Sequence, residues 1–395
     1  MIKRKKKNKE HNPFYDPTLK KRHVSAKRFK KFTLTSLIFS VAFLAFFLFD
    51  MIGKGIPAFN VAFIKVDVTF SEKTLEDTRF AVPAPYRNLV SRAALRDLPK
   101  LLEENPTYMN STQNIWILAS SQVDQYIKNH NHNLKDKDIA KVDELYAQGL
   151  IDKKFNAIFF ENGDSKIPEY AGIFSAVIGS ILTLIITMAV AFPIGVMTAI
   201  YLEEFAGDNK FTRFIEININ NLAAIPSILF GLLGLAIFIN LFGMPRSSPL
   251  VGGLTLALMT LPIIIVSSRA ALRAVPDSIR QAGYGLGLNK IQVTRDHVLP
   301  LAFPGIMTGS IIGLAQAMGE TAPLIIIGMI AFIPDAPSMV TQAATVMPAQ
   351  LFTWAGMPEG MYIEKTAAGI LVLLTILISL NAIAIYLRKK FEVKW

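Results

Sequence analysis

Six long apolar stretches, separated by polar segments, dominate the chain. They cover residues 33–52, 171–201, 214–241, 249–268, 302–333 and 366–387. A helix needs about 20 apolar residues to cross a hydrocarbon core of roughly 30 Å. Membrane-spanning β-strands would instead alternate apolar and polar residues over about 10 positions. The pattern therefore predicts an α-helical polytopic membrane protein with six transmembrane helices.

One polar connection is long enough to be a domain of its own. It runs from residue 53 to residue 170, between the first two apolar stretches. Helical spacing of apolar residues occurs in NLVSRAALRDLPKLLEE (88–104) and in DKDIAKVDELYAQGL (136–150). A strand followed by a turn is predicted for KFNAIFF (154–160) before ENGDS. We expect a small α+β domain that faces away from the cytoplasm.

Charge is distributed unevenly along the chain. Residues 1–31 hold thirteen Lys and Arg against two acidic residues, which accounts for the whole net charge of +11. A basic run before an apolar stretch holds the N-terminus in the cytoplasm. Nucleic-acid binding is not expected, because neither interleaved aromatic residues nor a folded basic face accompanies the charges. Residues 1–32 are therefore predicted to be a basic cytoplasmic tail.

The short connections follow the same charge rule. Those expected inside carry Lys210, Arg213, Arg269, Arg273, Arg280, Lys290, Arg295 and the C-terminal basic residues. Those expected outside carry only Arg246 and Lys365. Because Lys and Arg concentrate in cytoplasmic loops, both termini are predicted to be cytoplasmic, with residues 391–395 as the C-terminal tail. We expect a multi-pass protein of a bacterial inner membrane.

The polar segments hold few candidates for chemistry. His130 and His132 lie two apart in NHNHN, where a solvated loop is favoured over metal binding because no third ligand is near. Residues 334–365 are rich in Pro, Gly and Met and predict a structured outer loop, with Trp354 and Tyr362 suited to the membrane interface. The chain has no cysteine. No metal site and no catalytic residue are predicted.

The segment between the fourth and fifth apolar stretches has a distinct pattern. Pro276 suits the first turn of a short helix that Gly287 ends. One apolar stripe on that helix would be formed by Ile279, Ala282, Gly283 and Leu286. Asn289 can cap a second short helix, which Leu299 and Pro300 are expected to stop. The small residues favour close packing on protein over burial in lipid.

The glycines of this segment do not predict a nucleotide site. GYGLGL lacks the G-x-G-x-x-G spacing, no strand precedes it, and G-x-x-x-x-G-K-[ST] occurs nowhere in the chain. We therefore expect the chain itself to bind neither ATP nor Mg²⁺.

The same segment resembles the coupling loop of ABC importer membrane subunits, which has the form E-A-A, three residues, G, nine residues, I-x-L-P. The spacing matches at Gln281, Ala282, Gly283, Gly287, His297, Val298, Leu299 and Pro300. Gln281, Gly283 and His297 differ from the Glu, Ala and Ile of the motif. NLAAIPSILFGL (221–232) and GETAPL (319–324) resemble signatures of phosphate-specific permeases, and the C-terminal position of GETAP favours the PstA-type member. The resemblance implies a type I ABC importer permease fold with five transmembrane helices over residues 171–390, and a cytoplasmic coupling loop at 275–300.

What the resemblance implies is import of inorganic phosphate. The implied partners are a second, related permease subunit, an ATPase dimer that binds ATP and Mg²⁺, an extracytoplasmic phosphate-binding protein, and membrane lipid. A related oxyanion such as molybdate or sulfate remains an alternative substrate. An ion-coupled secondary carrier and a membrane-anchored receptor are the alternatives from other classes.

The fifth apolar stretch holds the most informative residues. Gly305, Gly309 and Gly313 recur every four residues, a spacing that lets another helix approach closely. Glu320 follows in the same stretch, where an ionised side chain costs about 2.5 kcal/mol or more. It must be neutralised, hydrated or paired with a cation of a neighbouring subunit, or it serves the translocation path. The resemblance places Gln316 where the family commonly has Arg.

Helix breaks are expected at two places within the apolar stretches. Pro226 predicts a kink or the end of a half-helix, and discontinuous helices are where transporters place substrate contacts. Thr321, before Pro323, has the same potential. The predicted pathway or gate residues are Gln316, Glu320, Thr321, Asn221 and Ser227.

Overall fold

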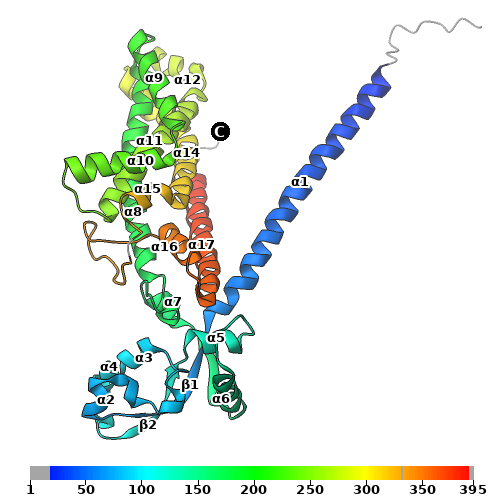
Figure 1. The fold of residues 1–395 in the computed structure, drawn as a ribbon. Helices are drawn as coiled ribbons and strands as arrows, with labels where there is room; N and C mark the ends of the chain where they lie inside the picture. Colours follow the sequence, from blue (N-terminus) through cyan, green and yellow to red (C-terminus); the bar gives the residue numbers. More distant parts are fainter. Residues whose placement is uncertain (1–17, 331, 391–395) are drawn as a thin grey trace, which may run out of the picture. The chain divides into compact units, whose positions relative to one another are not determined.

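The computed structural model describes residues 18–330 and 332–390. The chain forms two units, one that ends at Gly53 and one that begins at Lys54. Figure 1 labels their helices and strands. Residues 1–17 of the predicted basic tail, residues 1–32, lie outside the described residues. The predicted C-terminal tail, residues 391–395, lies entirely outside them.

Helix α1 (Leu19–Gly55) contains the first apolar stretch. It begins well before the predicted residue 33, because the Lys, Arg and Ala residues there are good helix formers and no proline interrupts them. Its 37 residues extend over about 55 Å at 1.5 Å per residue. The helix is therefore longer than a bilayer is thick, and its basic N-terminal turns extend beyond the apolar part.

The polar insert folds as an α+β domain, called the sheet domain below (residues 56–170). Its antiparallel sheet has the order β2-β1-β3 and consists of β1 (Asn60–Thr69), β2 (Thr112–Leu118) and β3 (Ile151–Phe155). Its helices are α2 (Glu72–Glu76), α3 (Arg92–Arg96), α4 (Leu98–Glu104), α5 (Ser121–Ile127), α6 (Asp136–Ala147) and α7 (Ala157–Glu161). The predicted fold class of the insert is confirmed.

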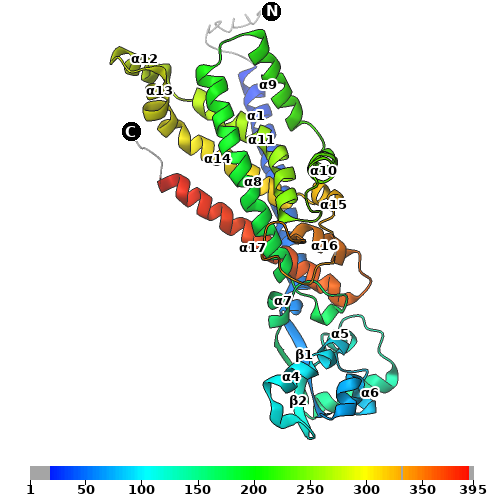
Figure 2. The same ribbon diagram turned by 90° about the vertical axis from the view of Figure 1, so that its left-hand side faces the viewer.

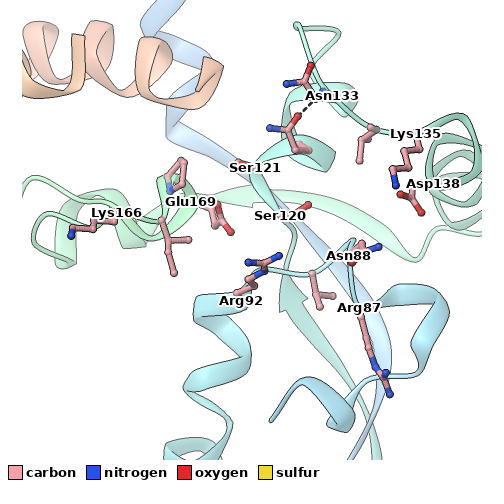
Figure 3. Close-up of a pocket in the computed structure, with 15 residues that line it drawn as sticks. Arg87, Asn88, Arg92, Ser120, Ser121, Asn133, Lys135, Asp138, Lys166 and Glu169 are labelled. Carbon is pink, nitrogen blue, oxygen red and sulfur yellow. Dashed lines mark hydrogen bonds between the residues drawn. The ribbon is translucent and has the colours of Figure 1, made fainter. Parts of the chain in front are cut away.

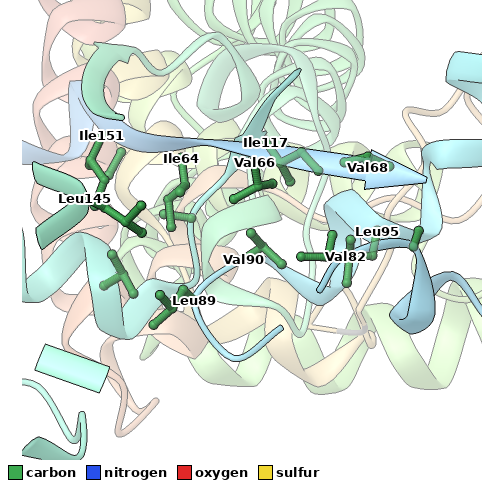
Figure 4. Packing of buried hydrophobic residues seen from close by; sticks show 14 of the residues in the cluster. Ile64, Val66, Val68, Val82, Leu89, Val90, Leu95, Ile117, Leu145 and Ile151 are labelled. Carbon is green, nitrogen blue, oxygen red and sulfur yellow. The ribbon is translucent and has the colours of Figure 1, made fainter. Parts of the chain in front are cut away.

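The core of the sheet domain lies on one face of β1. Alternate residues Ile64, Val66 and Val68 are buried against Val82 and Leu95 from the segments that cover the sheet (Figure 4). This period-two burial is what a half-covered strand requires. The domain therefore has a hydrophobic core of its own.

One local prediction in the sheet domain is wrong. KFNAIFF does not form a strand, because β3 stops at Phe155 and α7 begins at Ala157. The side chain of Asn156 accepts a hydrogen bond from the backbone N–H of Phe159 at 3.2 Å. Asn is a favoured N-cap residue, so it ends the strand and starts the helix.

Four long helices form the helical domain (residues 174–390). They are α8 (Phe174–Ile200), α11 (Pro249–Arg273), α14 (Leu299–Gly319) and α17 (Gly360–Lys390). In the most apolar part of α11, 61% of the residues are buried, whereas 28% are buried in the most apolar part of α8. Helix α11 is therefore central. With α1, five helices of the described chain are long and apolar enough to cross a membrane.

The third apolar stretch is not one straight span. Helix α9 (Lys210–Ala223) is followed by α10 (Ser227–Gly234) and the π-helical turn η7 (Leu235–Leu241). The two halves meet at an angle of 103°, and six spans result only if the bent pair counts as one. Pro226 stands directly before α10, in an extended conformation that ends one helix and starts the next. The predicted break at Pro226 is present.

The fifth stretch also differs from the predicted continuous span 302–333. Helix α14 ends at Gly319, and Glu320 has an extended backbone with ψ 119°. The short helices α15 (Ala322–Ile326) and α16 (Met347–Ala355) follow. Glu320 is thus at a helix terminus, not within a helix.

The expected stop at Leu299 and Pro300 is wrong. The chain is helical from α13 (Lys290–Val293) through the π-helical turn η8 (Thr294–Val298) into α14. In η8 the backbone N–H of Leu299 bonds to the carbonyl of Thr294, five residues earlier. This wider turn makes room for the ring of Pro300, which would otherwise collide with the preceding turn.

Candidate functional site

Helix α12 (Asp277–Gly285) carries the segment that resembles a coupling loop. It lies at the opposite end of the helical domain from the sheet domain (Figures 1 and 2). The helix ends before Gly287, whose φ of +81° is a left-handed conformation that favours glycine. The side chains of Asn289 and Gln292 then form a capping box at the start of α13. The predicted helix end and the predicted cap are therefore present.

An apolar hollow of about 400 Å³ lies between α12 and the start of α14. It is lined by Ile279, Ala282, Gly283, Leu286, Asp296, His297, Pro300 and Leu301. Gly283 packs on Val293, where an added Cβ would come within 2.8 Å of a methyl group. Leu286 is 79% exposed at the rim. An exposed leucine beside an apolar hollow is typical of a surface that another protein covers.

Three of the predicted coupling residues line this hollow, and three do not. Ala282, Gly283 and Pro300 line it. Gln281 is exposed on the same helix, and Leu299 is half-buried in the core below. Gly287 provides the turn between the two helices.

An ion pair that the sequence analysis missed holds α12 in place. The Arg280 guanidinium donates to Glu204 Oε1 at 2.7 Å and to the carbonyls of Leu272 (2.9 Å) and Val275 (2.8 Å). The side chains of Arg280 and Glu204 are 15% and 5% exposed. The hydrogen bond that Arg280 donates to Glu204 raises the pKa of Arg280, so the guanidinium stays charged. The pair connects α12 to the π-helical turn η6 (Tyr201–Phe205) that ends α8.

A second ionic cluster connects α8, α9 and α11 at the same end. Arg269 lies 3.3 Å from Glu203 and also pairs with Glu216 of α9. Arg273 lies 2.7 Å from Glu203. The LEEF sequence after the second apolar stretch thus provides carboxylates to three arginines, counting Arg280.

The glycine stripe of α14 packs inside the chain. Gly305 faces Ala271, where an added Cβ would come within 2.6 Å of the methyl group, and Gly309 faces Ser267. Gly313 lies against Ile264. The stripe therefore brings α14 close to α11. One turn further on, Gln316 is exposed.

The predicted pathway residues lie at two helix breaks. Asn221 and Ser227 flank the break before α10, and Glu320 and Thr321 form the break before α15. Helices α10 and α15 pack together, since an added Cβ at Gly231 would come within 2.7 Å of Pro323. The structure thus brings the two broken segments side by side.

The side chain of Glu320 is half-buried at its break. Within the described residues it makes no hydrogen bond or ion pair. Its charge is therefore not compensated by this part of the chain, which leaves water, a proton or another subunit.

The sheet domain is joined to α17 by buried polar contacts. Glu364 of α17 lies 3.0 Å from Lys128 Nζ and accepts from Gln125 Nε2 at 2.6 Å, and His130 Nδ1 is within hydrogen-bond distance. Lys128 also lies 2.6 Å from Asp124. His130 lies in an exposed loop, as predicted, and its ring also contacts this cluster.

Two aromatic residues expected at the membrane interface are buried in the same region. Trp354 donates to Asp164 at 2.8 Å, and Tyr362 donates to the carbonyl of Ser165 at 2.6 Å. Their exposed fractions are 0% and 2%. Lys365, assigned to an outer loop, is 1% exposed within α17 and donates to backbone carbonyls. These side chains bond to the sheet domain and the segment that follows it, not to lipid headgroups.

Comparison with known proteins agrees with this arrangement. Residues 191–393, just over half of the chain, match the family described as binding-protein-dependent transport system inner membrane component. The chain belongs to this family. It is therefore an inner-membrane component of a transport system and a multi-pass membrane protein. Residues 16–85 and 81–136 match a domain of unknown function, DUF3333.

Several curated proteins resemble this inner-membrane component. The phosphate transport system permease protein PstA of Mycobacterium leprae is 36% identical over 160 residues, 40% of this chain and 52% of that protein. PstA of Yersinia pestis is 30% identical over 245 residues, 61% of this chain and 81% of that protein. The probable ABC transporter permease protein YqgI of Bacillus subtilis is 33% identical over 168 residues, 42% of this chain and 56% of that protein. The chain spans about half the length of most of these relatives.

Among solved structures, a chain of the MetNI methionine ABC transporter in inward-facing conformations is similar. It gives a TM-score of 0.45 at 16% identity, over 56% of this chain and 98% of that chain.

Proposed function

We propose that this inner-membrane component is a permease subunit of an ATP-driven importer of inorganic phosphate. The support is its similarity to proteins named PstA, together with the hollow between α12 and α14 at the position of the coupling-loop residues. In this proposal the chain is not an enzyme. A partner ATPase dimer binds ATP and Mg²⁺ and hydrolyses the nucleotide.

The proposed orientation follows from charge. Both termini and α12 face the cytoplasm, since Lys and Arg concentrate in the connections at that end. The sheet domain then faces outward, where a phosphate-binding protein delivers its ligand. A second, related permease completes the membrane part.

The hollow carries the proposed coupling. An ATPase side chain that enters it contacts Ala282 of α12, Leu286 just after that helix and Pro300 of α14 at once. Because the Arg280–Glu204 pair holds α12 on the end of α8, α12 cannot move alone. Closure of the ATPase dimer therefore displaces α8, α12 and α14 together. Transport follows when this displacement favours one of two conformations of the spans.

The breaks at Pro226 and Glu320 are the proposed path. Phosphate is an anion, so an unneutralised carboxylate would repel it. A cation from the second permease is expected to pair with Glu320 in one conformation and to contact phosphate in the other. Gln316 of this chain supplies hydrogen bonds only.

Uptake of labelled phosphate tests the proposal. A strain that lacks this chain should lose ATP-dependent uptake and regain it with the wild-type chain, and excess sulfate or molybdate should compete poorly. Leu286→Asp, which places a charge at the rim of the hollow, should abolish uptake and crosslinking to the ATPase. Tyr146→Asp, at an exposed position of the sheet domain, is the matched control. Uptake that survives deletion of the ATPase would favour a secondary carrier instead.

A further inference from the structure

A polar hollow of about 440 Å³ opens in the sheet domain, at the N-terminal end of α5 (Figure 3). Cationic side chains reach it from separate segments: Arg92 from α3, Lys135 from the turn before α6, and Lys166 from the segment before the turn Pro168–Tyr170. In the view of Figure 3, Lys166 and Lys135 lie on opposite sides, with Arg92 between them. Residues that are distant in sequence thus place positive charge around one cavity.

These three cations are available to a ligand. Within the described residues, none of them makes a salt bridge or a side-chain hydrogen bond, and the one contact of this kind is Lys166 above the ring of Phe332 at 5.8 Å. All three are exposed. A fourth cation, Arg87, is already engaged, because it donates to the carbonyl of Val82 at 3.0 Å and stacks on Phe80.

The carboxylates of the hollow do not cancel this charge. Asp138 and Glu169 are the two that line it. Glu169 is 4% exposed and interacts with Ser91 and with the backbone N–H of Ser121. Burial raises the pKa of Glu169, which favours its neutral form. The hollow thus has two carboxylates, one of them buried, against three exposed cations.

Uncharged donors add to the cations. Asn88 and Asn133 line the hollow together with Ser120 and Ser121. The Ser120 hydroxyl is buried and has no hydrogen-bond partner within the part of the chain that the structure describes. That oxygen has almost no accessible surface, so the uncharged donors open to a ligand are Asn88, Asn133 and Ser121.

We propose that this pocket binds a small oxyanion of the phosphate class, either inorganic phosphate or a phosphate monoester. Three cations and several hydroxyl and amide donors suit the many acceptor oxygens of phosphate, and the polar lining does not suit an apolar ligand. The cavity is large enough for phosphate with ordered water or for a small ester. This inference deepens the proposed function, since it gives the importer an outward site for the class of its own substrate.

Helix α5 connects the pocket with the membrane part. Its first residue, Ser121, lines the pocket, and Gln125, about one turn later, and Lys128, about two turns later, bond to Glu364 of α17. An anion that orders the start of α5 therefore acts on the contact between the sheet domain and the last span. Occupancy of the pocket is expected to alter the stability of that contact.

Hydrogen exchange on the full chain in lipid nanodiscs tests the proposal. Inorganic phosphate, glycerol 3-phosphate and sulfate are added separately. Phosphate or its ester should slow amide exchange in residues 86–92 and 120–126, and the more effective of the two identifies the ligand. Arg92→Ala combined with Lys135→Ala should weaken this protection at least about tenfold, because each charged contact contributes about that factor. The matched control changes Arg96 and Lys137, exposed neighbours that do not line the pocket.

Uptake of labelled phosphate by membrane vesicles that contain this chain together with the second permease and the ATPase separates this inference from the proposed function. If phosphate is taken up but amide exchange at the pocket is not slowed, the proposed pocket is wrong and the proposed importer function is supported. Protection without uptake supports the pocket and contradicts the importer. Protection that the control variant weakens equally, or that sulfate produces as well as phosphate, also overturns the assignment.

Discussion

The Arg280–Glu204 pair is expected to hold the coupling helix on the membrane part. In Arg280→Met, Glu204 is left at 5% exposure without its partner, and the hydrogen bonds from the guanidinium to Glu204 and to the carbonyls of Leu272 and Val275 are lost. Removing one partner of a buried ion pair costs about 3–5 kcal/mol. Because Arg280 retains 15% exposure, the lower figure of about 3 kcal/mol applies, which is roughly a hundredfold in an equilibrium.

The expected result is local opening of α12. Amide protons of Asp277–Gly285 should exchange roughly a hundredfold faster, while those of the central helix α11 stay protected. Phosphate uptake should fall in parallel, because a detached α12 no longer transmits displacement. The double variant Arg280→Met with Glu204→Leu removes both charges and should recover most of the protection.

Arg295→Met is the matched control for this experiment. Arg295 pairs with the adjacent Asp296 at 2.6 Å, but the two side chains are 70% and 44% exposed. Exposed pairs contribute about 0–1 kcal/mol, so exchange in α12 should hardly change. If Arg280→Met leaves α12 protected, or if the double variant is no better than the single one, the pair does not hold the helix.

Three further changes test other parts of the chain. Glu320→Gln should lower phosphate uptake at least tenfold while the complex still assembles, and normal uptake in an intact complex would exclude a role in the path. Gly287→Ala should lower the free energy of unfolding by about 1–2 kcal/mol, because φ is +81° there. Gly285→Ala should not lower it, because there is open space around that Cα. Thermal unfolding of the two variants measures the difference. Glu364→Gln removes one of the carboxylates that pair with Lys128, whose side chain is 6% exposed. Proteolytic release of the sheet domain should therefore be faster. An unchanged rate of cleavage would show that these contacts do not hold the sheet domain on α17.

Features that depend on local pattern could be predicted from the sequence. The apolar stretches, the α+β insert, the helix end at Gly287 and the cap at Asn289 each depend on residues within a few positions of one another. Hydropathy and capping act over that range. The break at Pro226 belongs to the same group, since proline restricts its own neighbours.

Features that depend on partners distant in the sequence could not be predicted from it. Lys365 beside a long apolar run predicts a loop residue, yet the carbonyls of Glu169 and Ala171 accept its hydrogen bonds in the folded chain. Trp354 likewise finds Asp164, far earlier in the sequence. The pairing of Arg280 with Glu204 needed the packing of α12 on α8. A charged residue near the end of an apolar stretch therefore shows that a partner is needed, but not which one.

The error at Pro300 has the largest mechanical consequence. A stop at Leu299 and Pro300 would have left a flexible joint between the coupling surface and the membrane. The structure instead has one helical segment from Lys290 to Gly319, 30 residues long, which spans about 45 Å at 1.5 Å per residue. Its first turns reach the apolar hollow, its middle is packed on α11 through the glycine stripe, and its last turn ends at Gly319, directly before Glu320. A continuous helical segment couples its two ends more closely than a flexible joint would. A shift of the hollow is therefore expected to reach the break at Glu320 directly, and the glycines set the surface of α11 along which the helix moves.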